Sequence, residues 1–115
     1  MVSTRSLGDF EQLLLFAILR LEDDAYGVSI CRELEERARR AVSAGAVYTG
    51  LERLESKGLV TSKIGDTVPA RGGRRRRYYR LEPEGAAALA TSYEEIRRMA
   101  EGVHGRLTAL AAGRE

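Results

Sequence analysis

The 115-residue chain has one cysteine, one histidine, two prolines and no apolar run approaching the ~20 residues that a membrane-spanning helix needs. A single cysteine, Cys31, excludes an internal disulfide and agrees with a reducing compartment. Residues 1–6 are followed by acidic and polar side chains rather than by an apolar segment, so no secretory signal is expected. These absences predict a cytoplasmic protein with no membrane partner.

Residues for catalysis or metal binding are also scarce. His104 and Cys31 are expected on different helices, and no zinc spacing, nucleophile–base pair or phosphate loop is present. Gly72 and Gly73 lie beside arginines but lack the strand–loop–helix context of a nucleotide site. We therefore predict no enzyme, no catalytic residue, no metal and no cofactor. Cys31 is interpreted as a small buried side chain, with a redox-sensing thiol as the open alternative.

Positive charge is concentrated in the middle of the chain, although the net charge is only +2. Residues 1–36 contain 3 basic and 8 acidic side chains, and residues 81–115 contain 4 and 6. Residues 37–80 contain 12 basic and 3 acidic side chains. This distribution is typical of a nucleic-acid-binding surface on an otherwise ordinary globular domain.

A helix is predicted from Ser43 to Gly58. The Ser43 hydroxyl suits a helix N-cap, and Gly58 suits the left-handed residue that ends a helix. Val47, Leu51 and Leu54 follow helical spacing and form one apolar stripe. The other positions are expected to face outward, namely Tyr48, Thr49, Gly50, Arg53 and Lys57.

A basic-tipped β-hairpin is predicted after this helix. Residues 59–64 and 77–81 read as antiparallel strands, the second rich in aromatics. The loop between them, residues 65–76, carries Gly72, Gly73 and the arginines 74–76. Guanidinium groups on a glycine-rich tip attract a phosphate backbone. A helix followed by such a hairpin is the DNA-binding half of a winged helix-turn-helix.

Two helices are predicted before this unit. Residues 9–21, with Asp9 as the cap, are apolar around most of the helix, which indicates burial on two sides and hence a second subunit. Residues 22–24 are expected to cap a helix over residues 26–37. Basic side chains follow at the end of that helix. They either complement its negative end or contact phosphate, and both readings stay open for Arg37, Arg39 and Arg40.

A long terminal helix is predicted from Pro83 onward. Its apolar residues are spaced 4, 3, 4, 3, 4 and 3 apart, which is a heptad seam. Such a helix would be ~40 Å long, too long for this domain to cover, and a homodimer is expected. Gly102 and Gly105 would allow a kink. The predicted dimerisation residues are Leu15, Phe16, Leu19, Leu89, Tyr93, Ile96, Ala100, Val103, Leu107 and Leu110.

Two segments give this pattern a specific resemblance. Residues 45–60, which include Tyr48, and residues 73–89, with Tyr78-Tyr79-Arg80-Leu81 and Pro83-Glu84-Gly85, resemble the recognition helix and wing of PadR-family bacterial transcriptional regulators. The likeness covers residues 7–110. It implies a mainly α fold with a small β-hairpin. Residues 7–82 would form a winged helix-turn-helix and residues 83–112 a single C-terminal dimerisation helix. It also implies a dimeric repressor that reads an inverted repeat in double-stranded DNA, with half-sites about one turn (~10 bp) or a multiple apart.

The expected DNA contacts combine the recognition helix with the wing. The resemblance implies that Tyr48 contacts the DNA backbone, whereas a tyrosine packed under the wing is the alternative. Arg53 could instead pair with Glu52 or Glu55. Family members often carry a proline in this part of the wing, where this chain has Arg75. The full predicted set is Ser43, Ala46, Tyr48, Thr49, Arg53, Arg74, Arg75, Arg76 and Arg77.

In the resembled family, small apolar or aromatic compounds or cellular stress relieve repression. Some members stack flat aromatics between tryptophans at the dimer interface, a mode this chain cannot use because it has no Trp. An effector is instead expected to meet Leu15, Phe16, Tyr93 or Ile96. Two competing classes remain: a winged-helix protein-interaction module, and a MarR-like regulator, which normally has dimerisation helices at both ends.

Overall fold

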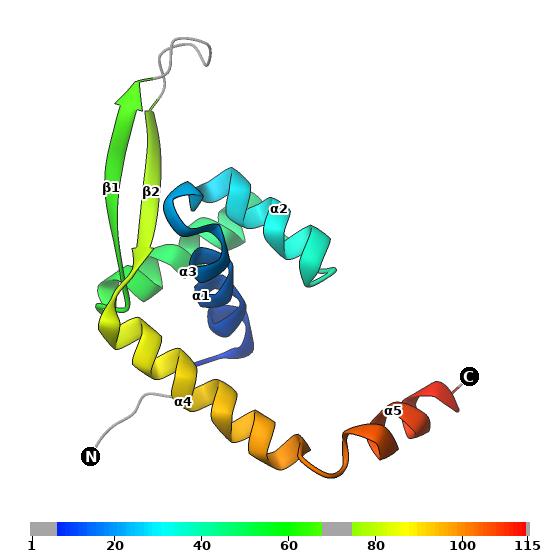
Figure 1. Cartoon of the computed structure of the whole chain (residues 1–115). Helices are drawn as coiled ribbons and strands as arrows, with labels where there is room; N and C mark the ends of the chain where they lie inside the picture. Colours follow the sequence, from blue (N-terminus) through cyan, green and yellow to red (C-terminus); the bar gives the residue numbers. More distant parts are fainter. Residues whose placement is uncertain (1–6, 68–74, 115) are drawn as a thin grey trace.

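The computed structural model describes residues 7–67 and 75–114 (Figure 1). Three helices come first: α1 (Asp9–Leu21), α2 (Gly27–Arg37) and α3 (Ala44–Ser56), with a short 3₁₀ turn, η1 (Glu22–Asp24), between α1 and α2. The antiparallel strands β1 (Val60–Thr67) and β2 (Arg75–Leu81) follow, and then α4 (Pro83–Ala100) and α5 (His104–Ala112). The predicted fold class, mainly α with a small β-hairpin, is confirmed.

The core lies where α1, α2 and α3 meet the base of the hairpin. The predicted stripe of α3, Val47, Leu51 and Leu54, is fully buried. Gly50, which was predicted to face outward, is also buried because α1 crosses α3 there. An added Cβ at Gly50 would lie 2.5 Å from Leu14 Cδ1. The largest fully buried side chains are Leu14, Leu15, Ile18, Ile30, Val47, Leu51, Leu54 and Val60.

Both ends of α3 agree with the sequence prediction. The Ser43 hydroxyl accepts a hydrogen bond from the Ala46 N–H at 3.0 Å. Gly58 has a φ of +78°, and the N–H of Leu59 donates to the Leu54 carbonyl at 3.0 Å. Only glycine adopts this left-handed backbone without strain, so α3 ends there and the chain turns into β1.

The predicted caps of α1 and α2 were wrong. Asp9 is the first residue of α1, and Gly8 occupies the cap position and donates its N–H to Glu11 at 3.1 Å. Residues 22–24 form the 3₁₀ turn instead of capping α2. The Ser29 hydroxyl instead binds the backbone at the start of α2. It accepts a hydrogen bond from the Tyr26 N–H at 2.9 Å and donates one to the Asp24 carbonyl at 2.6 Å.

The hairpin is longer than predicted and is joined to the body along one edge. Val60 pairs with Leu81 and Ile64 with Arg77, and a bulge follows Ile64. The N–H of Tyr79 donates to the Ala25 carbonyl at 2.8 Å, so the segment before α2 pairs with β2. Arginines 75 and 76, expected in the loop, lie in β2. Gly72, Gly73 and Arg74 lie outside the described residues.

The C-terminal part is not the single ~40 Å helix that the heptad spacing predicted. α4 ends at Ala100, Gly102 has a φ of +82°, and α5 begins at His104. The kink expected at Gly102 is therefore confirmed, and it is sharp enough to end the helix. Figure 1 shows α4 leaving the body of the domain and α5 continuing in a new direction. Within the described parts of the chain, no helix has the length and apolarity required to cross a bilayer.

Candidate nucleic-acid interface

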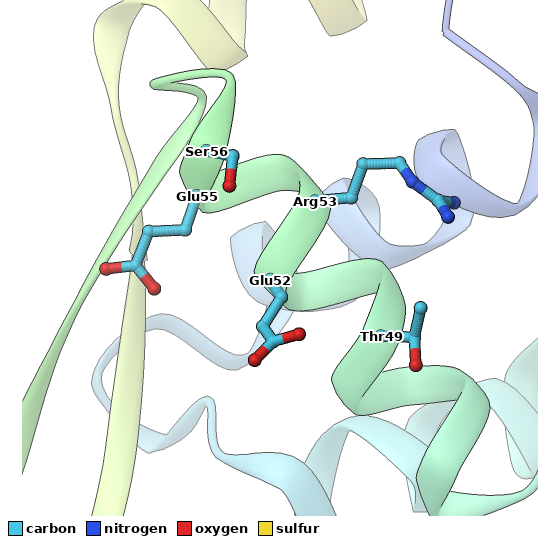
Figure 2. A pocket seen from close by; sticks show the side chains of 5 residues that line it. All are labelled: Thr49, Glu52, Arg53, Glu55 and Ser56. Atoms are coloured by element: carbon cyan, nitrogen blue, oxygen red, sulfur yellow. The ribbon is translucent and has the colours of Figure 1, made fainter.

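The exposed face of α3 lies opposite its buried stripe. At 3.6 residues per turn, positions 45, 49, 52 and 56 point away from Val47 and Leu51. All four side-chain positions are exposed. Figure 2 shows the shallow hollow on this face, lined by Thr49, Glu52, Arg53, Glu55 and Ser56. Small residues and one long carboxylate therefore form the part of α3 that projects furthest from the core.

Tyr48 lies beside this face and reaches the start of α2. Its side chain is 47% exposed, yet its hydroxyl packs against Gly27, the first residue of α2. An added Cβ at Gly27 would collide with the hydroxyl oxygen and lie 2.5 Å from Tyr48 Cζ. Gly27 thus admits the tyrosine, because any side chain at this position would occupy the space of the Tyr48 hydroxyl.

A polar chain joins the wing to α3. The Glu55 carboxylate accepts from the Ser62 hydroxyl at 2.9 and 3.1 Å, and Arg77 Nη1 donates to Ser62 Oγ at 3.0 Å. Ser62 lies on β1 and Arg77 on β2, so both strands are fixed to the C-terminal half of α3. The side chain of Arg77 remains exposed next to this chain.

Arg76 has a different environment from the exposed loop predicted for it. Its guanidinium lies 3.9 Å above the Tyr26 ring, and Nη1 donates to the Tyr78 hydroxyl at 3.2 Å. This hydrogen bond is the main cause that raises the pKa of Arg76 above its ordinary value. Its Nε is buried and has no hydrogen-bond partner within the described residues. Arg76 is therefore half-buried and fixes the wing to the start of α2, whereas Arg75 and Arg77 are exposed.

Arg53 does not pair with its helical neighbours. Figure 2 shows its side chain directed toward α1 and away from Glu52 and Glu55. No ion pair joins it to either glutamate in the part of the chain that the structure describes. Its charge is instead one of the influences that lower the pKa of Glu11. Arg53 is exposed on the α1 side of α3, where Ala46 also lies.

Arg37, at the end of α2, and Arg39 and Arg40, which follow it, have different surroundings. Arg37 contacts Glu33 one turn earlier at 3.4 Å, which agrees with the helix-end reading. The guanidinium of Arg40 lies 5.4 Å from the centre of the Phe10 ring and so faces α1. Arg39 has a φ of +56° and is exposed. The phosphate-contact reading stays a prediction for all three arginines, since each side chain remains exposed.

Only some of the residues predicted for the dimer interface and the effector site are exposed in the single chain. Leu15 and Leu89 are 0% and 4% exposed within the single chain, so they belong to its own core. Leu15 is therefore removed from the predicted dimer and effector surfaces, and Leu89 from the predicted dimer surface. Phe16 packs edge-on against Tyr93, with ring centroids 5.8 Å apart. Other predicted residues are well exposed. They are Leu19, Tyr93, Ile96, Val103, Leu107 and Leu110, joined by Met99, which the heptad reading missed.

Cys31 is half-buried on α2. Burial, and then the negative charge of Glu35, raise the pKa of its thiol above its ordinary value. The thiolate needed for redox sensing is therefore disfavoured. No three His, Cys, Asp or Glu side chains come together as metal ligands among the residues that the structure describes.

Sequence reasoning missed Glu52, Glu55, Ser62 and Gly27 as parts of this surface. Glu52 could have been found, because it follows Thr49 by three positions on the outward face of a correctly predicted helix. The contact between Gly27 and Tyr48 has no local signal, since it joins two helices whose approach the sequence does not show. The same holds for the chain from Glu55 through Ser62 to Arg77.

Three helices with an exposed third helix and an attached two-stranded wing define a winged-helix DNA-binding protein. The model of the PadR-like transcriptional regulator family matches residues 15–91, more than half of the chain. The chain belongs to the PadR family and is a DNA-binding transcriptional regulator. The family and the relatives described next are regulators and not enzymes.

Similar proteins cover most of the chain. It is 35% identical over 86 residues to transcriptional regulator Rv3488 of Mycobacterium tuberculosis, which covers 73% of this chain and 74% of that protein. A PadR-family regulator from Clostridium difficile R20291 has a TM-score of 0.72 at 30% identity, covering 87% of this chain and 99% of its own. RosR of H. salinarum has a TM-score of 0.69 at 28% identity, covering 96% and 94%.

Proposed function

We propose that the chain is a dimeric repressor that binds an inverted repeat and is released by a small-molecule or stress signal. In this proposal residues 7–82 bind DNA and residues 83–112 hold the dimer together. The observation that carries the dimer is the apolar face of α4 and α5, which the single chain leaves uncovered. Ile96, Met99, Leu107 and Leu110 are 58–80% exposed. Exposed large apolar side chains gathered on one segment mark an interaction surface.

The proposed DNA contacts follow from the two projecting elements. α3 would enter the major groove, with Ser43, Ala46 and Thr49 near base edges or phosphates. Tyr48 and the exposed arginines Arg75 and Arg77 would contact the adjoining backbone, and Arg53 would do so on the α1 side. This placement is supported by the exposure of these side chains and by the attachment of both strands to α3.

The proposed effector is a small apolar or aromatic compound. It would meet the ring pair of Phe16 and Tyr93 and the neighbouring exposed Ile96. These side chains lie on α1 and α4, so a compound between them would change the angle at which α4 leaves the domain. That angle sets the separation of the two α3 helices in a dimer, and a shift of it would weaken binding to a fixed half-site spacing. A melting-temperature screen in which no such compound raises Tm would contradict this part.

DNA binding is tested by fluorescence anisotropy on the DNA upstream of the gene, at several salt concentrations. Wild type is compared with Arg75→Ala/Arg77→Ala and with scrambled DNA, and Arg76 is kept because it fixes the wing to α2. We expect tight binding that prefers the native sequence, falls steeply with salt and is strongly weakened in the double variant. Arg98→Ala/Arg106→Ala is the control, because it removes equal charge from the C-terminal region. Equal weak binding to both DNAs would favour a protein-interaction module instead.

The dimer is tested by sedimentation of wild type and Ile96→Glu/Met99→Glu. We expect a dimer for wild type and a monomer for the variant, because burying two carboxylates in an apolar interface is strongly unfavourable. Ala87→Glu, an exposed position on another side of α4, is the control and should stay dimeric. A monomeric wild type at micromolar concentration would overturn this part of the proposal.

Repression itself is tested with a reporter gene behind the bound promoter, whose expression should rise when the regulator is deleted.

A further inference from the structure

A carboxylate stands in the middle of the face of α3 that would approach DNA. Positions 45, 49, 52 and 56 form the outermost row of the helix, and Glu52 is the one charged side chain among them. Its neighbours in this row, Gly45, Thr49 and Ser56, are small. Glu52 is therefore the side chain that reaches furthest from this row (Figure 2). A polyanion repels a carboxylate at that place, so Glu52 lowers affinity unless it meets a specific hydrogen-bond donor.

Among the residues described, the charged side chains around Glu52 donate no hydrogen bond to its carboxylate oxygens. Glu55 is engaged by the Ser62 hydroxyl at 2.9 and 3.1 Å. Arg53 is directed toward α1 (Figure 2). Glu52 itself forms no hydrogen bond or ion pair with the residues that the structure describes. Its carboxylate is thus available to a partner outside the chain.

Major-groove chemistry restricts that partner. A carboxylate only accepts hydrogen bonds, and the donors on base edges in the major groove are the amino groups of cytosine and adenine. Adenine places the N7 acceptor beside its amino group, which would repel the second carboxylate oxygen. Cytosine offers its N4 amino group without an acceptor of its own in that groove. On the DNA-binding function proposed above, we infer that Glu52 is a specificity-determining residue that reads a cytosine in each half-site.

The same carboxylate would act against other sequences. Opposite guanine or thymine it would face the carbonyl oxygen acceptors of those bases, and no donor would offset the repulsion. Glu52 would therefore weaken binding to non-cognate DNA while its hydrogen bond to cytosine favours cognate binding. Specificity is a difference between these two affinities, and such a repulsive element raises it.

The experiment selects bound duplexes from a random 24-bp pool with wild type, Glu52→Gln and the control Glu36→Gln. Glu36 is exposed at the end of α2, and its substitution removes the same charge from a position outside the α3 face. We expect wild type to select one invariant cytosine in each half-site. Replacing that base should weaken wild-type binding about tenfold or more. Glu52→Gln should relax this position alone or turn it toward adenine, which an amide recognises through N6 and N7. Glu36→Gln should keep the wild-type profile.

The outcomes separate this inference from the proposed function. If wild type selects a sequence and Glu52→Gln selects the same one, Glu52 reads no base and the inference fails while the function stands. If Glu52→Gln strengthens binding to all duplexes equally, the carboxylate only repels phosphate and the inference also fails. If wild type selects no sequence, the proposed binding to a specific inverted repeat is itself wrong. Equal melting temperatures for the three proteins exclude misfolding as a cause.

Discussion

Replacing Lys57 with Met tests how the start of α1 is fastened to the end of α3. Lys57 Nζ lies 2.8 Å from the Glu11 carboxylate, and the two side chains are only 27% and 11% exposed. Glu11 also accepts from the Gly8 N–H at 3.1 Å. The substitution keeps most of the unbranched side chain but removes the ammonium group, so a mostly buried carboxylate loses its cation. The sequence had suggested an outward-facing lysine, so this ion pair is specific to the tertiary structure.

The expected cost is about 2 kcal/mol of unfolding free energy. A charge-assisted hydrogen bond contributes ~1.5–3 kcal/mol, and removing one partner of a fully buried pair costs ~3–5 kcal/mol. Because position 57 is partly exposed, water can solvate Glu11 in the variant. The expected cost therefore lies within the lower of these two ranges. For a domain of this size, Tm should fall by about 8 °C.

The effect should depend on pH with a definite sign. Burial alone raises the pKa of Glu11, but hydrogen bonds from Lys57 and Gly8 and the charges of Lys57 and Arg53 outweigh it, so the pKa lies below its ordinary 4.5. A carboxyl whose pKa is lowered by folding stabilises the fold above its unfolded pKa and loses that contribution as the pH falls through its folded pKa. The difference between wild type and Lys57→Met should therefore be full at neutral pH and shrink at acid pH.

The assay is urea unfolding at one fixed protein concentration, because subunit association would also contribute to stability. Wild type, Lys57→Met, Glu11→Gln and the double variant are compared at neutral pH and at a pH below 4.5. Lys63→Met, an exposed lysine on β1, should behave as wild type. A change of less than about 0.5 kcal/mol in Lys57→Met, the range of ordinary surface substitutions, would refute the reasoning. A difference that does not shrink at acid pH would refute the assignment to Glu11.

Three further predictions concern single side chains around the interface. Gly27→Ala should displace the Tyr48 ring, because the added Cβ would lie 2.5 Å from Tyr48 Cζ, and should weaken DNA binding severalfold in anisotropy; unchanged affinity would show that binding does not depend on the position of this ring. Gly58→Ala should lower stability by about 1 kcal/mol in urea unfolding, because its φ of +78° strains any side chain although the space around it is open. Arg77→Gln should lower the slope of log affinity against log salt by about 1, and an unchanged slope would show that Arg77 contacts no phosphate.

Local patterns accounted for the elements of the DNA-binding half. The stripe of Val47, Leu51 and Leu54, the Ser43 cap and the Gly58 end were all predicted because each depends on residues within a few positions of one another. The hairpin was predicted for the same reason, although its strands extend further toward the tip. The resemblance of residues 45–60 and 73–89 to PadR-family regulators indicated the family before any contact was known, and the match of residues 15–91 to the family model confirmed it.

Contacts between distant segments decided the rest. Lys57 meets Glu11 across 46 positions, and Arg76 lies on the Tyr26 ring instead of at the exposed tip. Periodicity shows that a helix has a polar face, but not which remote side chain lies against a given position of it. A heptad pattern likewise does not report backbone angles, and the left-handed Gly102 divides the predicted seam into α4 and α5.

The sequence by itself determined a winged helix with a basic wing and an apolar C-terminal segment, because these features follow from spacing and charge along the chain. Only the tertiary structure decided that Leu15 and Leu89 are core residues and that Glu55 is occupied while Glu52 is available. These differences arise because burial and hydrogen bonding belong to pairs of segments brought together by packing. A single stretch of sequence supplies only one of the two segments, so it does not show which residues will be buried or hydrogen-bonded by the other.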